Sequence, residues 1–152
     1  HRAELDGSKV RVRQIVLLVD RKADDAAWKT VGETLSGIRK EIASGQIAFE
    51  EAARKHSQSP SGQEGGNVVP FGFDGKMPRS VTEAAFALKE GELSEVVRSA
   101  FGMPLLQLVE RMPGDLSVED ARPKILEALS RELWTETLAR ERKKAKITVA
   151  PQ

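Results

Sequence analysis

The chain has 152 residues, of which 39% are hydrophobic and 31% are charged, so it is long enough to bury the core of one globular domain. Its formal net charge of +1 provides no overall attraction to nucleic acid or to anionic lipid. Cysteine is absent, which excludes disulfides, thiolate metal ligands and a cysteine nucleophile, and with only two histidines we expect no metal site.

No segment of the sequence suggests a membrane span or a signal peptide. The longest uncharged apolar run, Ile15–Val19, is far too short to cross a bilayer. The first residues lack the apolar region of a signal peptide. Because the chain begins with His1 rather than Met, we expect it to be part of a longer protein whose targeting segment is not included.

The first part of the chain predicts a strand followed by two helices. The stretch KVRVRQIVLLVD, residues 9–20, alternates valine with arginine and then becomes continuously apolar, as in a strand that is first exposed and then central. Asp24 and Asp25 predict a helix start, because acids suit the positive end of the helix dipole, and Gly45 predicts its end. A shorter helix is predicted over residues 48–57.

A glycine-rich segment between Ser59 and Met77 interrupts this run of helices. Its centre, residues 67–73, is expected to hold a short strand, with Pro70 at a sheet edge or strand end because it has no N–H. The segment is either a flexible linker or a shaped loop beside a bound ligand.

The next part of the chain predicts one helix and two strands. Ser80 is the expected N-cap of the helix, Glu83 its capping-box partner and Gly91 its stop signal. A short strand is predicted over residues 93–99, and a turn followed by a strand over residues 101–112.

A change in composition at residues 113–117 precedes a long predicted helix, roughly residues 118–144. Pro123 either kinks this helix or marks its true start. The end of the chain, residues 146–152, predicts a short strand. This helix is expected to carry an apolar stripe that must be buried against the rest of the chain, a missing domain or a second chain. The stripe consists of Ile125, Leu126, Leu129, Leu133 and Leu138.

Strands separated by helices predict an α+β fold, with a small sheet covered by helices. The first and last strong strands are expected to be neighbours at the centre of that sheet. We divide the chain into an N-terminal flank (residues 1–9), a domain (residues 10–112), and a C-terminal helix with a short terminal strand (residues 113–152).

Over about Val10 to Arg111, the sequence resembles the parvulin-type peptidyl-prolyl cis/trans isomerases. The resemblance depends on FEEAARKHSQSPSGQEGGNVVPFGFDGKM and EAAFALKEGELSEVVRSAFGMPLLQLVER in this order. It implies a four-stranded antiparallel sheet wrapped by short helices, and an isomerase that needs no cofactor. The long helix and the KITV segment resemble the flanks of secreted or periplasmic parvulin foldases, which implies a periplasmic or extracytoplasmic location.

Several positions of the family site are altered in this chain. The two family histidines, in the first and last strands, correspond to Gln14 and Pro104, and the family's Cys-or-Asp position corresponds to Ser59. The resemblance places substrate binding at four further residues: Val68, Met77, Val81 and Phe101.

Because both histidines are absent, we expect weak isomerase activity on unfolded or proline-containing polypeptides. One alternative is a non-catalytic, chaperone-like module that binds such segments, and another is a domain that forms a homodimer through the C-terminal helix. Without the resemblance, the apolar pocket residues would be interpreted as core, Gln14 as a hydrogen-bonded polar residue of the interior, and Ser59 as a turn residue.

Overall fold

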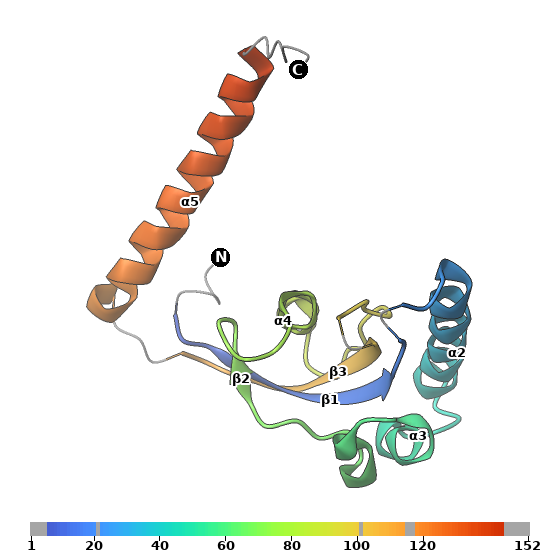
Figure 1. Ribbon diagram of the computed structural model, residues 1–152. Helices are drawn as coiled ribbons and strands as arrows, with labels where there is room; N and C mark the ends of the chain where they lie inside the picture. The colour runs from blue at the N-terminus through green and yellow to red at the C-terminus, as the bar shows by residue number, and fades with distance from the viewer. Residues whose placement is uncertain (1–5, 21, 101, 115–117, 145–152) are drawn as a thin grey trace, which may run out of the picture. The chain divides into compact units, whose positions relative to one another are not determined.

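The computed structural model describes residues 6–20, 22–100, 102–114 and 118–144 (Figure 1). The chain forms two compact units, His1–Asp115 and Leu116–Gln152. The elements of the first unit are β1 (Lys9–Leu17), α2 (Asp25–Ala43), α3 (Phe49–His56), the 3-10 helix η1 (Pro60–Glu64), β2 (Phe71–Gly72), α4 (Arg79–Ala87) and β3 (Met103–Met112). The second unit contains α5 (Val118–Lys144).

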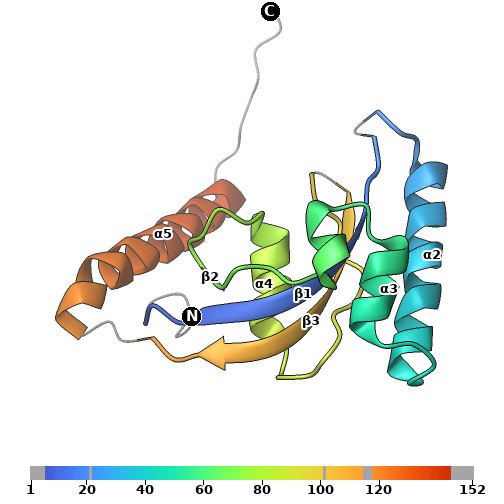
Figure 2. The ribbon, with the colours of Figure 1, turned by 90° about the horizontal axis from the view of Figure 1, so that it is seen from below.

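The sheet has β1 at its centre, between β2 and β3, and both pairings are antiparallel. The prediction that the two strongest strands are neighbours is therefore confirmed, but only β1 is central; β3 lies at an edge of the three strands that the described residues form. Figure 2 shows β1 and β3 side by side and running in opposite directions. They pair from Lys9 opposite Met112 to Leu17 opposite Met103, with one register shift after Arg11.

The prediction of a four-stranded sheet is wrong, because the described residues form three strands. Residues 93–99, the expected fourth strand, lie beside β3. They make isolated bridges with the chain rather than a continuous ladder with β3. The Ser94 N–H donates to the Leu106 carbonyl at 2.8 Å, yet the Leu106 N–H donates to Ser94 Oγ at 3.0 Å. A side-chain hydroxyl thus takes a bond that a backbone carbonyl would accept in a regular strand.

The predicted boundaries of α2 are confirmed. The Asp24 carboxylate accepts the Ala27 N–H at 2.9 Å and so caps the first turn. Gly45, with a φ of +74°, follows the last turn in the left-handed region that favours glycine.

The predicted N-cap of α4 is wrong by two residues. The helix begins at Arg79, so Ser80 lies inside its first turn and Pro78 occupies the cap position. The Pro78 carbonyl accepts the Thr82 N–H at 3.0 Å. Glu83 forms an ion pair with Arg79 at 2.7 Å instead of the predicted capping box.

Hydrophobic clusters cover both faces of the β1–β3 pair, and Figure 1 shows α4 on one side of this pair and α3 on the other. Alternation along the strands assigns each side chain to a face. The α4 side buries Val10, Val12, Phe71, Val81, Ala85, Leu88, Leu106 and Leu108. The other side buries Ile15, Leu35, Ile38, Phe49, Ala52, Ala53 and Leu105.

The long predicted helix is present as α5, and Pro123 lies inside it near its start. The predicted terminal strand, residues 146–152, falls outside the described residues. Within the described part of the chain, no helix has the length and apolar character required to cross a membrane.

Candidate functional site

A groove of about 400 Å³ lies at the end of β1 in the first unit. It brings together the end of β1, the segment before η1, the loop between β2 and α4, and the start of β3. The lining residues are Gln14, Val16, Leu18, Gln58, Ser59, Pro60, Lys76, Met77, Pro78, Val81, Ser99 and Pro104.

Most of the residues selected from the sequence meet in this groove. Val68 is not among the lining residues; it is half-buried and packs against the cluster beneath α4. Phe101 lies outside the described residues. The selected residues that line the groove are Gln14, Ser59, Met77, Val81 and Pro104.

The start of β3 tolerates a proline because the opposite residue of β1 bonds elsewhere. Pro104 is opposite Val16. The Val16 N–H donates to Ser57 Oγ at 3.1 Å, and its carbonyl accepts the Gln58 N–H at 2.8 Å. The missing N–H of Pro104 therefore costs no bond to β1, while its carbonyl accepts the Val97 N–H at 3.0 Å.

Gly66 allows the glycine-rich segment to press against β1. The Gln14 N–H donates to the Gly66 carbonyl at 2.8 Å. Gly66 has a φ of +82°, and a Cβ at this position would lie 2.5 Å from the Gln14 carbonyl oxygen. Only glycine fits both the backbone conformation and the distance. The start of the segment is therefore a shaped wall against β1 and not a flexible linker.

Three serines at alternate positions form a chain of hydrogen bonds along this wall. Ser57 Oγ accepts the N–H groups of Val16, at 3.1 Å, and of Ser59, at 3.4 Å. Ser57 Oγ lies 3.3 Å from Ser59 Oγ, which lies 2.7 Å from Ser61 Oγ. Gln14 Nε2 donates to Ser61 Oγ at 3.3 Å and closes the chain.

Ser61 was not selected from the sequence. The signal that would have identified it is the repetition of serine at 57, 59 and 61, at the end of a helix and beside the proline that starts η1. Hydroxyls two residues apart readily bond to one another and to the neighbouring backbone in such a turn.

The groove is mainly apolar, with a few hydroxyl and amide groups. Among the described residues that line it, Lys76 is the only ionisable one, and none is a histidine, cysteine, aspartate or glutamate. Among the residues that the structure describes, no group of three such side chains is placed to hold a metal ion. The chemistry available from the lining is non-covalent binding of an apolar group flanked by hydrogen-bonding groups.

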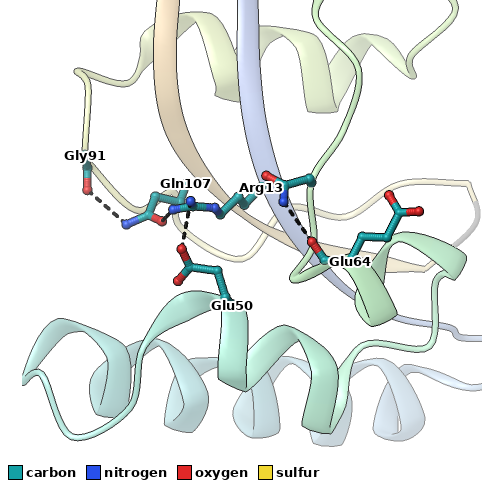
Figure 3. A network of polar contacts seen from close by, with 6 residues as sticks. Arg13, Glu50, Glu64, Gly91 and Gln107 are labelled. Carbon is teal, nitrogen blue, oxygen red and sulfur yellow. Dashed lines mark hydrogen bonds and ion pairs between the residues drawn. The ribbon is translucent and has the colours of Figure 1, made fainter.

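A polar network on the opposite face of β1 holds α3 against the strands (Figure 3). Arg13 forms an ion pair with Glu50 of α3 at 2.7 Å and donates to Gln107 of β3 at 3.4 Å. Gln107 in turn donates to the Gly91 carbonyl at 3.5 Å. Arg13 precedes Gln14 directly, so this network fixes the strand on which the groove is built.

Comparisons with known proteins agree with the fold. The family model "Rotamase: PPIC-type PPIASE domain" matches residues 15–110. The chain is 29% identical over 114 residues to the peptidyl-prolyl cis-trans isomerase Pin1 of Malus domestica. This alignment covers 66% of this chain and 93% of that protein. It is 32% identical over 112 residues to the chaperone SurA of Albidiferax ferrireducens, covering 74% of this chain but 24% of that protein.

A solved structure extends the similarity beyond the first unit. The peptidylprolyl isomerase PrsA from Bacillus cereus is 25% identical with a TM-score of 0.65, and the alignment covers 97% of this chain and 54% of that chain. The family model spans more than half of the sequence and includes most of the groove. The chain therefore belongs to the parvulin family of peptidyl-prolyl isomerase domains, the PPIC type.

Proposed function

We propose that the groove binds proline-containing segments of unfolded polypeptides and isomerises their Xaa-Pro bonds weakly. The observation that carries this proposal is the meeting of apolar and polar groups in one groove. Met77, Val81 and Pro104 offer an apolar surface for a proline ring, beside the amide of Gln14 and the hydroxyl of Ser59. Val81 is 3% exposed, so its side chain forms a fixed floor.

Such a groove accelerates rotation if it binds the twisted peptide bond better than either planar form. Rotation about the peptide bond crosses a barrier of about 18–20 kcal/mol, because resonance is lost at the twisted midpoint. An apolar surface holds the ring, while fixed polar groups interact with the altered charges of the twisted amide. No covalent intermediate is needed.

The expected weakness has its origin in Gln14 and Pro104. A glutamine amide donates and accepts hydrogen bonds but does not reproduce a pair of neutral imidazoles. Pro104 contributes no side-chain or backbone donor. The site thus keeps the groove of the family while lacking both of the histidines that the resemblance implies.

An NMR titration with a short Ala-Pro peptide tests this function. We expect chemical-shift changes at Gln14, Ser59 and Met77, together with exchange between the cis and trans peptide signals that is faster than in the free peptide. The same shifts without faster exchange would favour the non-catalytic binding module. No shifts at these residues would overturn the proposal, and a rate equal to that of parvulins with both histidines would contradict its weakness.

The rate and the affinity are expected to be nearly independent of pH between about pH 5.5 and 8. Among the described residues, no histidine, cysteine or carboxylate lines the groove, and these are the side chains that ordinarily titrate in or near this interval. Exchange rates measured at several pH values with a peptide that has blocked ends provide the check. A sigmoidal or bell-shaped profile would show that an ionising group outside the lining takes part.

We further propose that the parent protein acts outside the cytoplasm as a folding factor. The similarity to PrsA supports this, because it covers nearly the whole chain including α5. The similarity to SurA chaperones supports it as well, although the chain spans about a quarter of their length. Fractionation of cells that express the full-length protein tests the location; recovery in the cytoplasm alone would contradict it.

A second candidate function is homodimerisation, favoured by apolar side chains on α5. If this helix pairs two chains, replacing Leu129 and Leu133 with lysine is expected to convert the dimer to a monomer, measured by light scattering. A wild-type chain that is monomeric at high concentration would exclude this function. The exposed side chains are Leu126, Leu129, Leu133, Trp134 and Leu138.

A further inference from the structure

We propose that Ser61 is a positioning residue of the groove, and that it acts through Gln14. Its hydroxyl accepts a hydrogen bond from the side-chain amide nitrogen of Gln14. This bond orients the side-chain oxygen of Gln14, Oε1, so that it accepts an N–H from the bound peptide. This inference rests on the proposed function of the groove as a peptide-binding site.

The direction of the hydrogen bonds along the serine chain follows from its first member. Ser57 Oγ accepts two backbone N–H groups, at 3.1 and 3.4 Å, and these donors occupy its lone pairs. Its own proton is then directed to Ser59 Oγ, at 3.3 Å. Ser59 in turn donates to Ser61 at 2.7 Å. Ser61 therefore receives a hydrogen bond from the chain and a second one from Gln14 Nε2 at 3.3 Å.

The position of the Gln14 side chain is restricted at both of its ends. Its backbone N–H donates to the Gly66 carbonyl at 2.8 Å, and in the sheet it is opposite Leu106. Its amide nitrogen is held by Ser61. Within the described residues, Gln14 Oε1 receives no hydrogen bond. Among these residues, Arg13 Nε is the only side-chain nitrogen or oxygen that is both buried and without a partner, so Gln14 Oε1 is not buried. This oxygen is thus a free acceptor on a residue that lines the groove.

A peptide N–H is the ligand group that such an acceptor recognises. Proline has no N–H, so the donor belongs to one of the two residues that flank the proline. The groove is therefore expected to select Xaa-Pro-Yaa segments by the ring of the proline and by one adjacent N–H. A segment whose neighbouring N–H is removed loses this contact while it keeps the apolar one.

Four single variants and one double variant separate the hydroxyl of Ser61 from its volume and from its structural role. In the NMR titration with the Ala-Pro peptide, Ser61→Ala is expected to raise the Kd about three- to tenfold, the worth of one hydrogen bond. Ser61→Thr keeps the hydroxyl and should restore the Kd to within about twofold, while Ser61→Cys keeps the volume but bonds weakly and should resemble alanine. Gln14→Met should weaken binding as much as Ser61→Ala, and the double variant no further, because the two residues act as one unit.

Methylated peptides test the acceptor directly. One of two peptides, N-methylated at the residue before or after the proline, is expected to bind the wild-type chain more weakly, and Gln14→Met should not distinguish it from the unmethylated peptide. Equal affinity of wild type and Ser61→Ala, or additive losses in the double variant, would overturn the inference while the proposed function stands. If the wild-type chain binds no Ala-Pro peptide, both fail. A two-dimensional spectrum of each variant shows that it is folded, and Gln14→Met supplies the test if Ser61→Ala is not.

Discussion

Replacing Gly66 with alanine is expected to lower the free energy of unfolding by about 2–5 kcal/mol, from left-handed backbone strain and from overpacking. The alanine Cβ would lie 2.5 Å from the Gln14 carbonyl oxygen and 3.2 Å from the Ala53 Cβ. Both neighbours are held in place, since Gln14 belongs to the central strand and Ala53 is a fully buried residue of α3. The loop must therefore move away from β1, and the wall of the groove moves with it. Urea denaturation and the peptide titration measure the two effects.

Gly37 provides a matched control for this substitution. It lies inside α2, and a Cβ at its position would meet nothing within 4 Å. Gly37→Ala is expected to raise the free energy of unfolding by about 0.5–1 kcal/mol, because alanine restricts the unfolded chain and favours the helix. A Gly66→Ala variant as stable as the wild type would show that the loop has room that the structure does not give it.

Restoring two histidines, with Gln14→His and Pro104→His together, is expected to raise the rate of cis/trans exchange by about tenfold or more. Both positions line the groove. In the register of the sheet, Pro104 is opposite Val16, two residues along β1 from Gln14, so both side chains lie on one face. The substitutions recreate the pair that the family resemblance implies, and β1 needs no bond from position 104. Exchange spectroscopy with the Ala-Pro peptide measures the rate.

This variant is also expected to gain a dependence on pH that the wild type lacks. If the neutral imidazoles are the active form, the rate should fall as the pH decreases through about 6–7, where histidine takes up a proton. Gln58→His places an imidazole in the same groove without forming the pair, and it should change the rate by less than about twofold. Because Pro104 is buried, Gln14→His alone serves as a second test. An unchanged rate in a folded double variant would exclude the lost histidines as the reason for weak activity.

Local signals in the sequence were sufficient for most of the elements. The Asp24 cap and Gly45 stop give α2 both of its ends, because a capping bond and a positive φ each depend on one residue. The alternation in residues 9–20 predicted β1, since each face of a central strand needs its own apolar side chains. Where a local signal was ambiguous it failed: Ser80 matched a capping pattern, but the turn begins at Pro78.

Part of the groove also followed from the sequence, since the resemblance selected five residues that line it. Val68 was selected by the same pattern but packs against the core, because a two-residue β2 gives the preceding segment no regular alternation. The serine chain was missed in part, because the bond between Ser61 and Gln14 joins residues 47 positions apart. No local pattern of either segment requires that contact.

By itself, the sequence determined the α-helices, the two long strands β1 and β3, the α+β class and the family, because caps, apolar periods and a motif order are properties of short stretches. Only the tertiary structure decided how many strands the sheet has, since the Ser94 hydroxyl replaces a ladder bond to Leu106. It also decided why Pro104 is tolerated and which groups Gln14 presents to the groove. These outcomes depend on hydrogen bonds between segments far apart in the chain. Each N–H group has several possible acceptors in the sequence, and only the folded structure brings one of them within bonding distance.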